Sequence, residues 1–180
     1  MPKNPKQRAV TVDDLASRSR SETDRFMLFE RYCKQKPTPD AIPLLRHALG
    51  DSYHAIVKCA AHSLRKLGPV AREAMADLLT AAARVDGPTG MPQAYAECVT
   101  AMAAIEPQHP ELLPLIKNFV GLDNWGPLSA SLKALKTIGT PEAKDLLHRT
   151  AAFWLPELNK MQRRVVEPLL ADNQGGEAEV

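Results

Sequence analysis

Apolar residues recur along the chain at intervals of three and four, which is the spacing of one face of an α-helix. Between residues 53 and 67, a helical wheel places on one face Tyr53, Val57, Ala60, Ala61, Leu64 and Leu67. Short alanine-rich runs such as LLTAAAR and AMAAI add strong helix formers. No segment alternates apolar and polar residues between turn signals, so the sequence predicts an all-α fold without a β-sheet.

One block of this pattern occurs twice. Residues 112–139 align with residues 41–68 without a gap, at a displacement of 71 positions, which is 112 minus 41. Identical residues stand at five aligned pairs: Pro43/Pro114, Leu44/Leu115, Gly50/Gly121, Leu64/Leu135 and Gly68/Gly139. Self-similarity at a fixed displacement indicates a repeated structural unit.

Weaker copies lie between and after these two blocks. MADLLTAA from Met75 matches IPLLRHAL from Ile42, and YAECVTAMAAIE from Tyr95 matches VKCAAHSLRKLG from Val57. A fourth copy begins with TPEAKDLLHRTA at Thr140. The copies are separated by about 31 to 38 residues, which is the length of a two-helix unit. The sequence therefore predicts about four pairs of antiparallel helices.

Residues that favour helix ends support these boundaries. Thr38 and Thr140 each precede a proline, an arrangement typical of the N-cap and first position of a helix. Asp51 and Asp123 stand where the second helices of two units begin. Glycines stand at the predicted helix ends, where we expect a left-handed backbone at Gly50, Gly68, Gly121 and Gly139.

An early proline in the first helix and a final L-x-x-[LI]-G in the second resemble HEAT repeats, particularly the short bacterial kind, over roughly residues 38–170. The resemblance implies a right-handed α-α superhelix of about four helix pairs. The family's aspartate between helices and its basic residue early in the second helix match Asp51 and Lys58. In the third unit Leu122 and Ser129 stand at these positions instead.

The flanking segments are predicted to cap this repeat region. Thr11 is a candidate cap for a short helix, and Ser21 with Asp24 begins a second helix that runs to about Gln35. The predicted organisation is a disordered tail at 1–10, capping helices at 11–37, the repeat domain at 38–170 and a disordered tail at 171–180.

Composition narrows the classes of function. The 180 residues carry a net charge of only +2, which is too small by itself to indicate a polyanionic partner. Three scattered cysteines do not form a disulfide framework. The N-terminus lacks the apolar run of a secretory signal, and no segment approaches the roughly 18 apolar residues of a membrane span. We therefore expect a cytoplasmic protein.

A stripe of polar residues opposite the apolar face is the candidate binding surface, because it corresponds to the concave lining of a HEAT solenoid. Carrying Lys58, His62 and Arg65 through the repeat gives a surface that is basic at both ends and neutral in the middle. Its further positions are Ala96, Thr100 and Ala103, then Ser129, Lys133 and Lys136, and finally Lys160, Arg164 and Glu167. The candidate partner-binding residues are Lys58, His62, Arg65, Thr100, Lys133, Lys136, Lys160 and Arg164. Cations in the last turn of a helix also stabilise its dipole, which is the alternative explanation for Arg65 and Lys136.

Catalytic groups do not converge in the sequence. Cys59 and His62 are three residues apart and offer two metal ligands, but no clear third ligand emerges, so we predict no metal, no cofactor and no enzyme activity. HEAT-like alkylpurine DNA glycosylases pair a basic face with aromatic residues, whereas Trp125 and Trp154 lie off the predicted stripe. The favoured hypothesis is a non-catalytic protein-binding module, an adaptor or an immunity-type inhibitor. The alternative is a nucleic-acid-binding protein related to those glycosylases.

Overall fold

The computed structural model describes residues 10–13, 21–84, 92–121 and 123–171. Every regular element within these ranges is helical and none is a strand, which confirms the all-α prediction. The predicted tails at 1–10 and 171–180, and the short helix after Thr11, lie almost wholly outside the described residues. None of the helices in the described part of the chain is long and apolar enough to cross a membrane.

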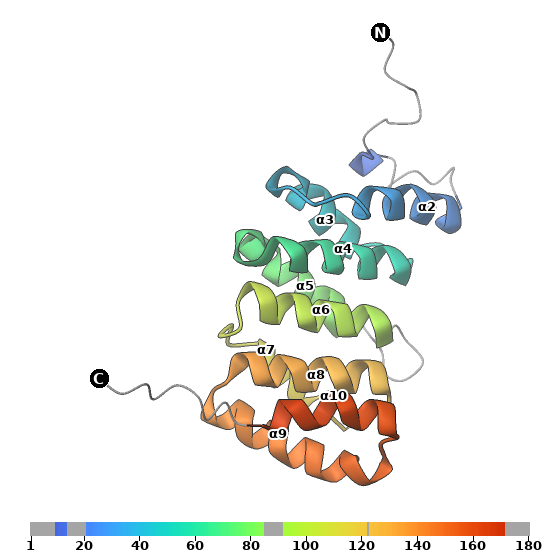
Figure 1. The fold of residues 1–180 in the computed structure, drawn as a ribbon. Coiled ribbons are helices and arrows are strands. Elements are labelled where there is room, and N and C mark those ends of the chain that lie inside the picture. The colour runs from blue at the N-terminus through green and yellow to red at the C-terminus, as the bar shows by residue number, and fades with distance from the viewer. Residues whose placement is uncertain (1–9, 14–20, 85–91, 122, 172–180) are drawn as a thin grey trace.

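The helices form two rows (Figure 1). The front row consists of neighbours that pack against one another in order: α2 (Glu22–Cys33), α4 (His54–Leu67), α6 (Pro92–Ile105), α8 (Trp125–Ile138) and α10 (Lys160–Leu170). The back row contains α3 (Ile42–Leu49), α5 (Met75–Ala83), α7 (Leu112–Lys117) and α9 (Pro141–Trp154). Three 3-10 helices supplement them: η2 (Pro39–Ala41), η3 (Gly68–Ala74) and η5 (Leu155–Glu157).

The bounds of the front-row helices agree with the sequence register. α4, α6 and α8 each contain 14 residues. Shifting His54, the first residue of α4, by the 38 residues that separate Val57 from Tyr95 leads to Pro92, the first residue of α6. The displacement of 71 residues leads likewise to Trp125, the first residue of α8.

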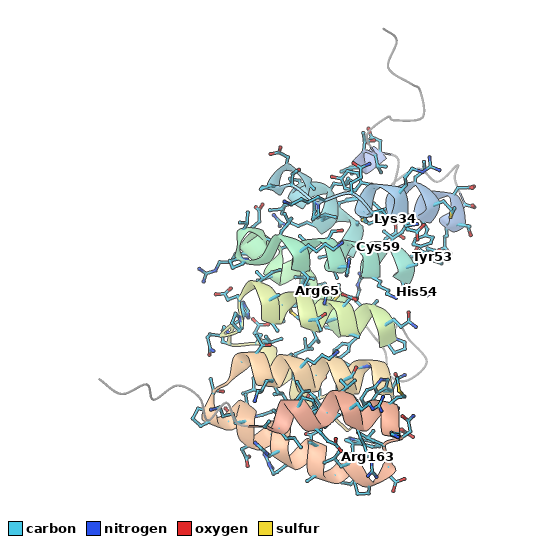
Figure 2. All side chains as sticks on the ribbon, viewed as in Figure 1. Lys34, Tyr53, His54, Cys59, Arg65 and Arg163 are labelled. Carbon is cyan, nitrogen blue, oxygen red and sulfur yellow. The ribbon has the colours of Figure 1, made fainter. Side chains whose placement is uncertain are left out.

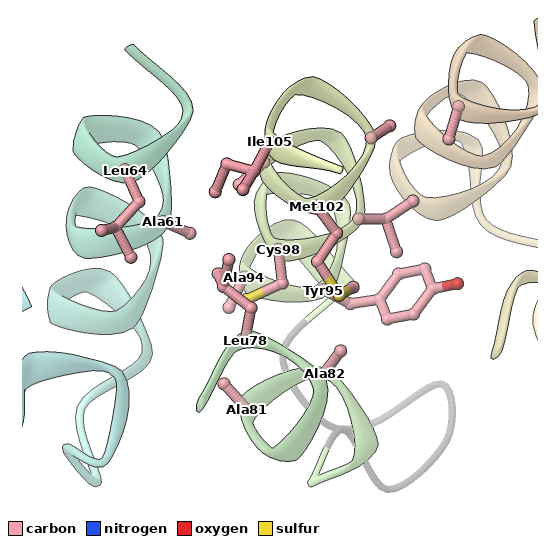
Figure 3. Close-up of a cluster of buried hydrophobic side chains, with 14 of the residues drawn as sticks. Ala61, Leu64, Leu78, Ala81, Ala82, Ala94, Tyr95, Cys98, Met102 and Ile105 are labelled. Atoms are coloured by element: carbon pink, nitrogen blue, oxygen red, sulfur yellow. The ribbon is translucent and has the colours of Figure 1, made fainter. Parts of the chain in front are cut away.

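Equivalent leucine and methionine side chains form the centre of the core. Leu64 of α4, Met102 of α6 and Leu135 of α8 are each 0% exposed, which confirms the predicted burial of the two leucines. Figure 3 shows the cluster around α6, where Ala61 and Leu64 of α4 and residues of α5 gather. Small alanine side chains let the helices approach closely, so the core is built from helix backbones as much as from large side chains.

Two of the predicted N-caps form a side-chain capping bond and one does not. The Ser21 hydroxyl accepts a hydrogen bond from the Asp24 backbone N–H at 3.1 Å, and the Thr140 hydroxyl accepts one from Ala143 at 3.2 Å. Thr38 makes no capping bond through its side chain. Thr38 is nevertheless the N-cap residue, with Pro39 at the first position, but the helix that begins there is the 3-10 helix η2, and α3 begins only at Ile42.

Of the four glycines predicted to have a left-handed backbone, two have a positive φ angle and two do not. Gly68 and Gly139 have φ angles of 61° and 67°, a region that side chains with a Cβ rarely adopt. Gly50 has a φ of −81°, and Gly121 also lacks a positive φ, so both of these predictions are wrong. At Gly50 the helix ends with a tight bond from its N–H to the His47 carbonyl at 3.0 Å, which needs no left-handed residue.

Side chains from neighbouring units complete the helix ends. The Arg84 guanidinium donates to the Leu49 carbonyl and, at 3.2 Å, to the Gly50 carbonyl at the end of α3. Gln108 donates to the Ile138 carbonyl at 2.8 Å at the end of α8. These bonds satisfy carbonyls that a helix leaves unpaired, and they tie adjacent units together.

A shielded ion pair fixes α2 to the start of α4. Arg25 of α2 contacts Asp51, and the two side chains are only 13% and 6% exposed. Asp51 also accepts a hydrogen bond from the Tyr53 backbone N–H at 2.7 Å. One carboxylate therefore both orders the entry to α4 and holds the N-terminal helix.

Candidate binding surface on the front row

All eight predicted binding residues lie on front-row helices, and none of them is fully buried. The structure distributes them over four helices, α4, α6, α8 and α10, as the register predicts. Their surroundings differ from one end of the row to the other. The stripe residues of α4 are engaged by the neighbouring helix α6, whereas most stripe cations of α8 and α10 have no such partner within the described residues.

Glu97 of α6 offsets the charge of the α4 stripe. One of its carboxylate oxygens lies 3.6 Å from His62 Nδ1 and 3.7 Å from Arg65 Nε. Arg65 also donates to His62 Nδ1 at 2.9 Å, and Figure 2 shows Arg65 beside the junction of α4 and α6. The Glu97 side chain is only 22% exposed, so the attraction is screened less than at an open surface.

Lys58, the remaining stripe residue of α4, also contacts α6. Lys58 donates from Nζ to the side-chain oxygen of Gln93, at 3.0 Å. The sequence reasoning followed the stripe alone and missed both Gln93 and Glu97. The sequence register could have indicated Glu97. It is the α6 equivalent of Cys59, the residue directly after Lys58, and so lies beside the stripe.

The middle of the row offers little to a partner. The Thr100 hydroxyl donates to carbonyls of its own helix, those of Ala96 at 2.9 Å and Glu97 at 3.1 Å. Ala103, which the register assigned to the same lining, is only 4% exposed and belongs to the core. The neutral middle of the stripe is therefore largely closed by packing and by local hydrogen bonds.

Most stripe cations of α8 and α10 have no acidic partner within the described residues, although the exposed Glu167 lies three residues after Arg164 on α10. The side chains of Lys133, Lys160 and Arg164 are exposed and make no hydrogen bond or ion pair there. Lys136 is tied to the end of α10, because its Nζ donates to the Ala171 carbonyl at 2.7 Å. Three solvated positive charges thus remain available on this part of the front row.

A hollow of about 410 Å³ lies over α4, between the C-terminal end of α2 and Glu97. Its lining includes Cys33, Cys59 and His62, and Figure 2 shows Cys59 on α4 below Lys34 of α2. Burial raises the pKa of the Cys59 thiol, and it raises the pKa of Cys33 to about 12. Both thiols therefore stay protonated at neutral pH and are weak nucleophiles.

Two further features of the geometry concern possible metal ligands and the two tryptophans. Across the residues that the structure describes, no group of three or more His, Cys, Asp or Glu side chains is arranged to hold a metal ion. Trp125 is partly buried against the core, and the Trp154 indole N–H donates to the Val120 carbonyl at 3.1 Å. Both tryptophans therefore serve packing between units.

Comparisons of the chain with protein-family models, with curated proteins and with solved structures found no match. The function of this protein is therefore inferred from its own residues and their geometry.

Proposed function

We propose that this protein is a HEAT-like, right-handed α-α superhelix of about four helix pairs that binds another protein without catalysis, through its front row. An adaptor or an immunity-type inhibitor would work in this way. The observation that carries the proposal is the set of exposed cations without acidic partners on α8 and α10, namely Lys133, Lys160 and Arg164. These groups favour a partner with an acidic surface.

The repeat assignment is supported by the matching bounds of α4, α6 and α8 and by the packing of each front-row helix on the next. It is also supported by side chains that satisfy helix ends at a similar sequence distance. Arg84 reaches back 34 residues to Gly50, and Trp154 reaches back 34 residues to Val120. Stacked units of this kind present a continuous row of helices, which suits recognition of an extended surface.

The helix dipole does not explain the three free cations. Lys160 is the first residue of α10, directly after the N-cap Asn159, where the dipole disfavours a positive charge. Lys133 lies before the last turn of α8, whose basic residue is Lys136. A positive charge kept at an unfavourable helix end is more readily explained by an external acidic group than by helix stability.

Nucleic acid is the second candidate, since phosphates also attract lysine and arginine. The net charge of +2 and the engagement of the α4 cations by Glu97 and Gln93 leave only a short basic surface. The tryptophans pack inside the protein and provide no stacking platform of the kind that single strands use. These observations favour protein over nucleic acid.

Affinity capture with charge-reversed variants tests the proposal. Wild-type protein and the Lys133→Glu/Arg164→Glu variant are used to capture partners from the native extract, with and without nuclease. We expect a protein that binds the wild type directly after purification, survives nuclease and is lost with the variant. Capture that nuclease abolishes, or tight salt-sensitive binding of an oligonucleotide that the variant loses, would instead support the nucleic-acid function.

A further inference from the structure

We propose that α8 and α10 bind an acidic protein segment whose carboxylates flank an apolar side chain. The binding surface is formed by Lys133, Lys160, Met161 and Arg164, and we call it the α8–α10 surface. The segment would supply from outside the carboxylate that Glu97 supplies from within at α4 and α6. This inference rests on the proposed protein-binding function and specifies the chemistry of the partner.

The repeat register brings the two regions into correspondence. At α4, the stripe residues His62 and Arg65 contact Glu97 on the next front-row helix. At α8, the register places Lys133 and Lys136 at the positions of His62 and Arg65. Glu97 directly follows Ala96, which is the α6 equivalent of Lys58. The α10 equivalent of Lys58 is Lys160, and the residue that directly follows it is Met161. The position that the Glu97 carboxylate occupies on α6 is therefore occupied by a methionine on α10.

Met161 makes this surface partly apolar as well as basic. Met161 is 70% exposed and is one of five exposed large hydrophobic residues in the described part of the chain. Met161 and Arg164 are three residues apart on α10, and Lys160 and Arg164 are four apart, so these side chains share one side of the helix. Methionine is a flexible apolar contact that adapts to a partner's side chains.

Charge complementarity selects an acidic protein segment as the occupant. Carboxylates can pair with the exposed ammonium and guanidinium groups, and an adjacent leucine or similar residue can cover Met161. A phosphate backbone would satisfy the cations but leave the exposed methionine without an apolar partner. The surface therefore matches a segment that carries both acidic and apolar residues.

A synthetic helical peptide with glutamates and leucines on one face serves as the probe. Its binding to the full chain is measured by fluorescence anisotropy, and we expect Lys133→Glu/Arg164→Glu to weaken it about tenfold or more. Met161→Glu should weaken it to a similar degree, because the new carboxylate occupies the register position of Glu97 and repels the peptide. Met161→Gln removes the apolar contact without adding charge, so it should weaken the binding only a few-fold, less than Met161→Glu does.

Three controls decide the interpretation. Circular dichroism should show the same thermal midpoint for all variants, since the changed side chains are exposed. A peptide with lysine in place of glutamate should not bind. Removal of residues 172–180 should leave the affinity unchanged, whereas a several-fold increase would assign the surface to the chain's own acidic tail and overturn the inference.

The outcomes separate this inference from the proposed function. Equal affinity of Met161→Glu and Met161→Gln, or no peptide binding by the wild type, would show that the specific chemistry is wrong. If a captured protein still depends on Lys133 and Arg164 in that case, the protein-binding function stands alone. Binding of an oligonucleotide in place of the peptide would overturn both.

Discussion

The two ends of the front row carry the same kind of residue in different surroundings. At α4 and α6, His62 and Arg65 lie within 3.7 Å of the Glu97 carboxylate. At α8 and α10, Lys133 and Arg164 are exposed and have no acidic partner in the described part of the chain. Basic residues in equivalent positions therefore do not form equivalent surfaces, because the next helix decides whether their charge is offset.

The stripe residues at the two ends of the front row therefore differ in what they contact. The charges of α4 and α6 join neighbouring helices, whereas those of α8 and α10 remain available to another molecule. The N-terminal end is further secured by the shielded pair between Arg25 and Asp51. The comparison can be tested through stability, where the two regions differ in kind, and through binding.

The largest effect is expected in the core, where the two regions should respond alike. Leu64→Ala and Leu135→Ala should each lower the free energy of unfolding by about 2 to 5 kcal/mol, because both side chains are 0% exposed. Chemical denaturation of the two variants measures this. A loss below 1 kcal/mol at either site, roughly what a surface substitution costs, would contradict equivalent core roles.

The next effect concerns an interaction at the N-terminal end. Asp51→Ala should cost about 2 kcal/mol, because it removes the shielded carboxylate that pairs with Arg25 and accepts the Tyr53 N–H. Asp123→Ala is the control near the start of α8, one residue after the register equivalent Leu122; Asp123 is exposed, so its loss should cost less than about 0.5 kcal/mol. Urea denaturation gives both values, and equal costs would remove this distinction between the regions.

Alkaline pH should weaken the N-terminal region selectively. The three cysteines lie in α2, α4 and α6, and burial raises the pKa of Cys33 and Cys98 to about 12 from a usual value of 9.0. Their contribution to stability is complete below pH 9 and declines as the pH rises toward 12, because the unfolded chain releases the thiol protons first.

The free energy of unfolding should therefore fall between pH 9 and the highest pH that the measurement allows. Cys98→Ala should show a shallower decline than the wild type when both are followed by denaturant titration at several pH values. Parallel curves for the two proteins would show that Cys98 does not contribute to the alkaline loss.

The smallest effect on stability, and the most informative on binding, is expected for Glu97→Gln. The ion pair with Arg65 and the contact with His62 are partly exposed, so their loss should cost no more than about 1 kcal/mol. The substitution frees the Arg65 guanidinium, and we expect a second, weaker site for the acidic peptide at α4 and α6. Isothermal titration should show the added site, and an unchanged single site would mean that Glu97 does not mask the α4 cations.

The helices and their faces were predictable from local patterns. The spacing of apolar residues correctly predicted the burial of Leu64 and Leu135, and Ser21 and Thr140 correctly marked helix starts. These features follow from the 3.6-residue period and from hydrogen bonds within a few residues. Gly50 departed from prediction because a helix end has several ways to satisfy its carbonyls, and here Arg84 from the next unit supplies one of them.

The sequence alone determined the all-helical fold and core-facing residues such as Leu64 and Leu135, because each depends on neighbours along one helix. Only the tertiary structure decided which cations are free. The contacts that settle this join residues about 35 positions apart, such as Arg65 with Glu97 and Lys58 with Gln93. The sequence specifies which side chains are charged, but the electrostatic field around each one depends on which helix packs beside it.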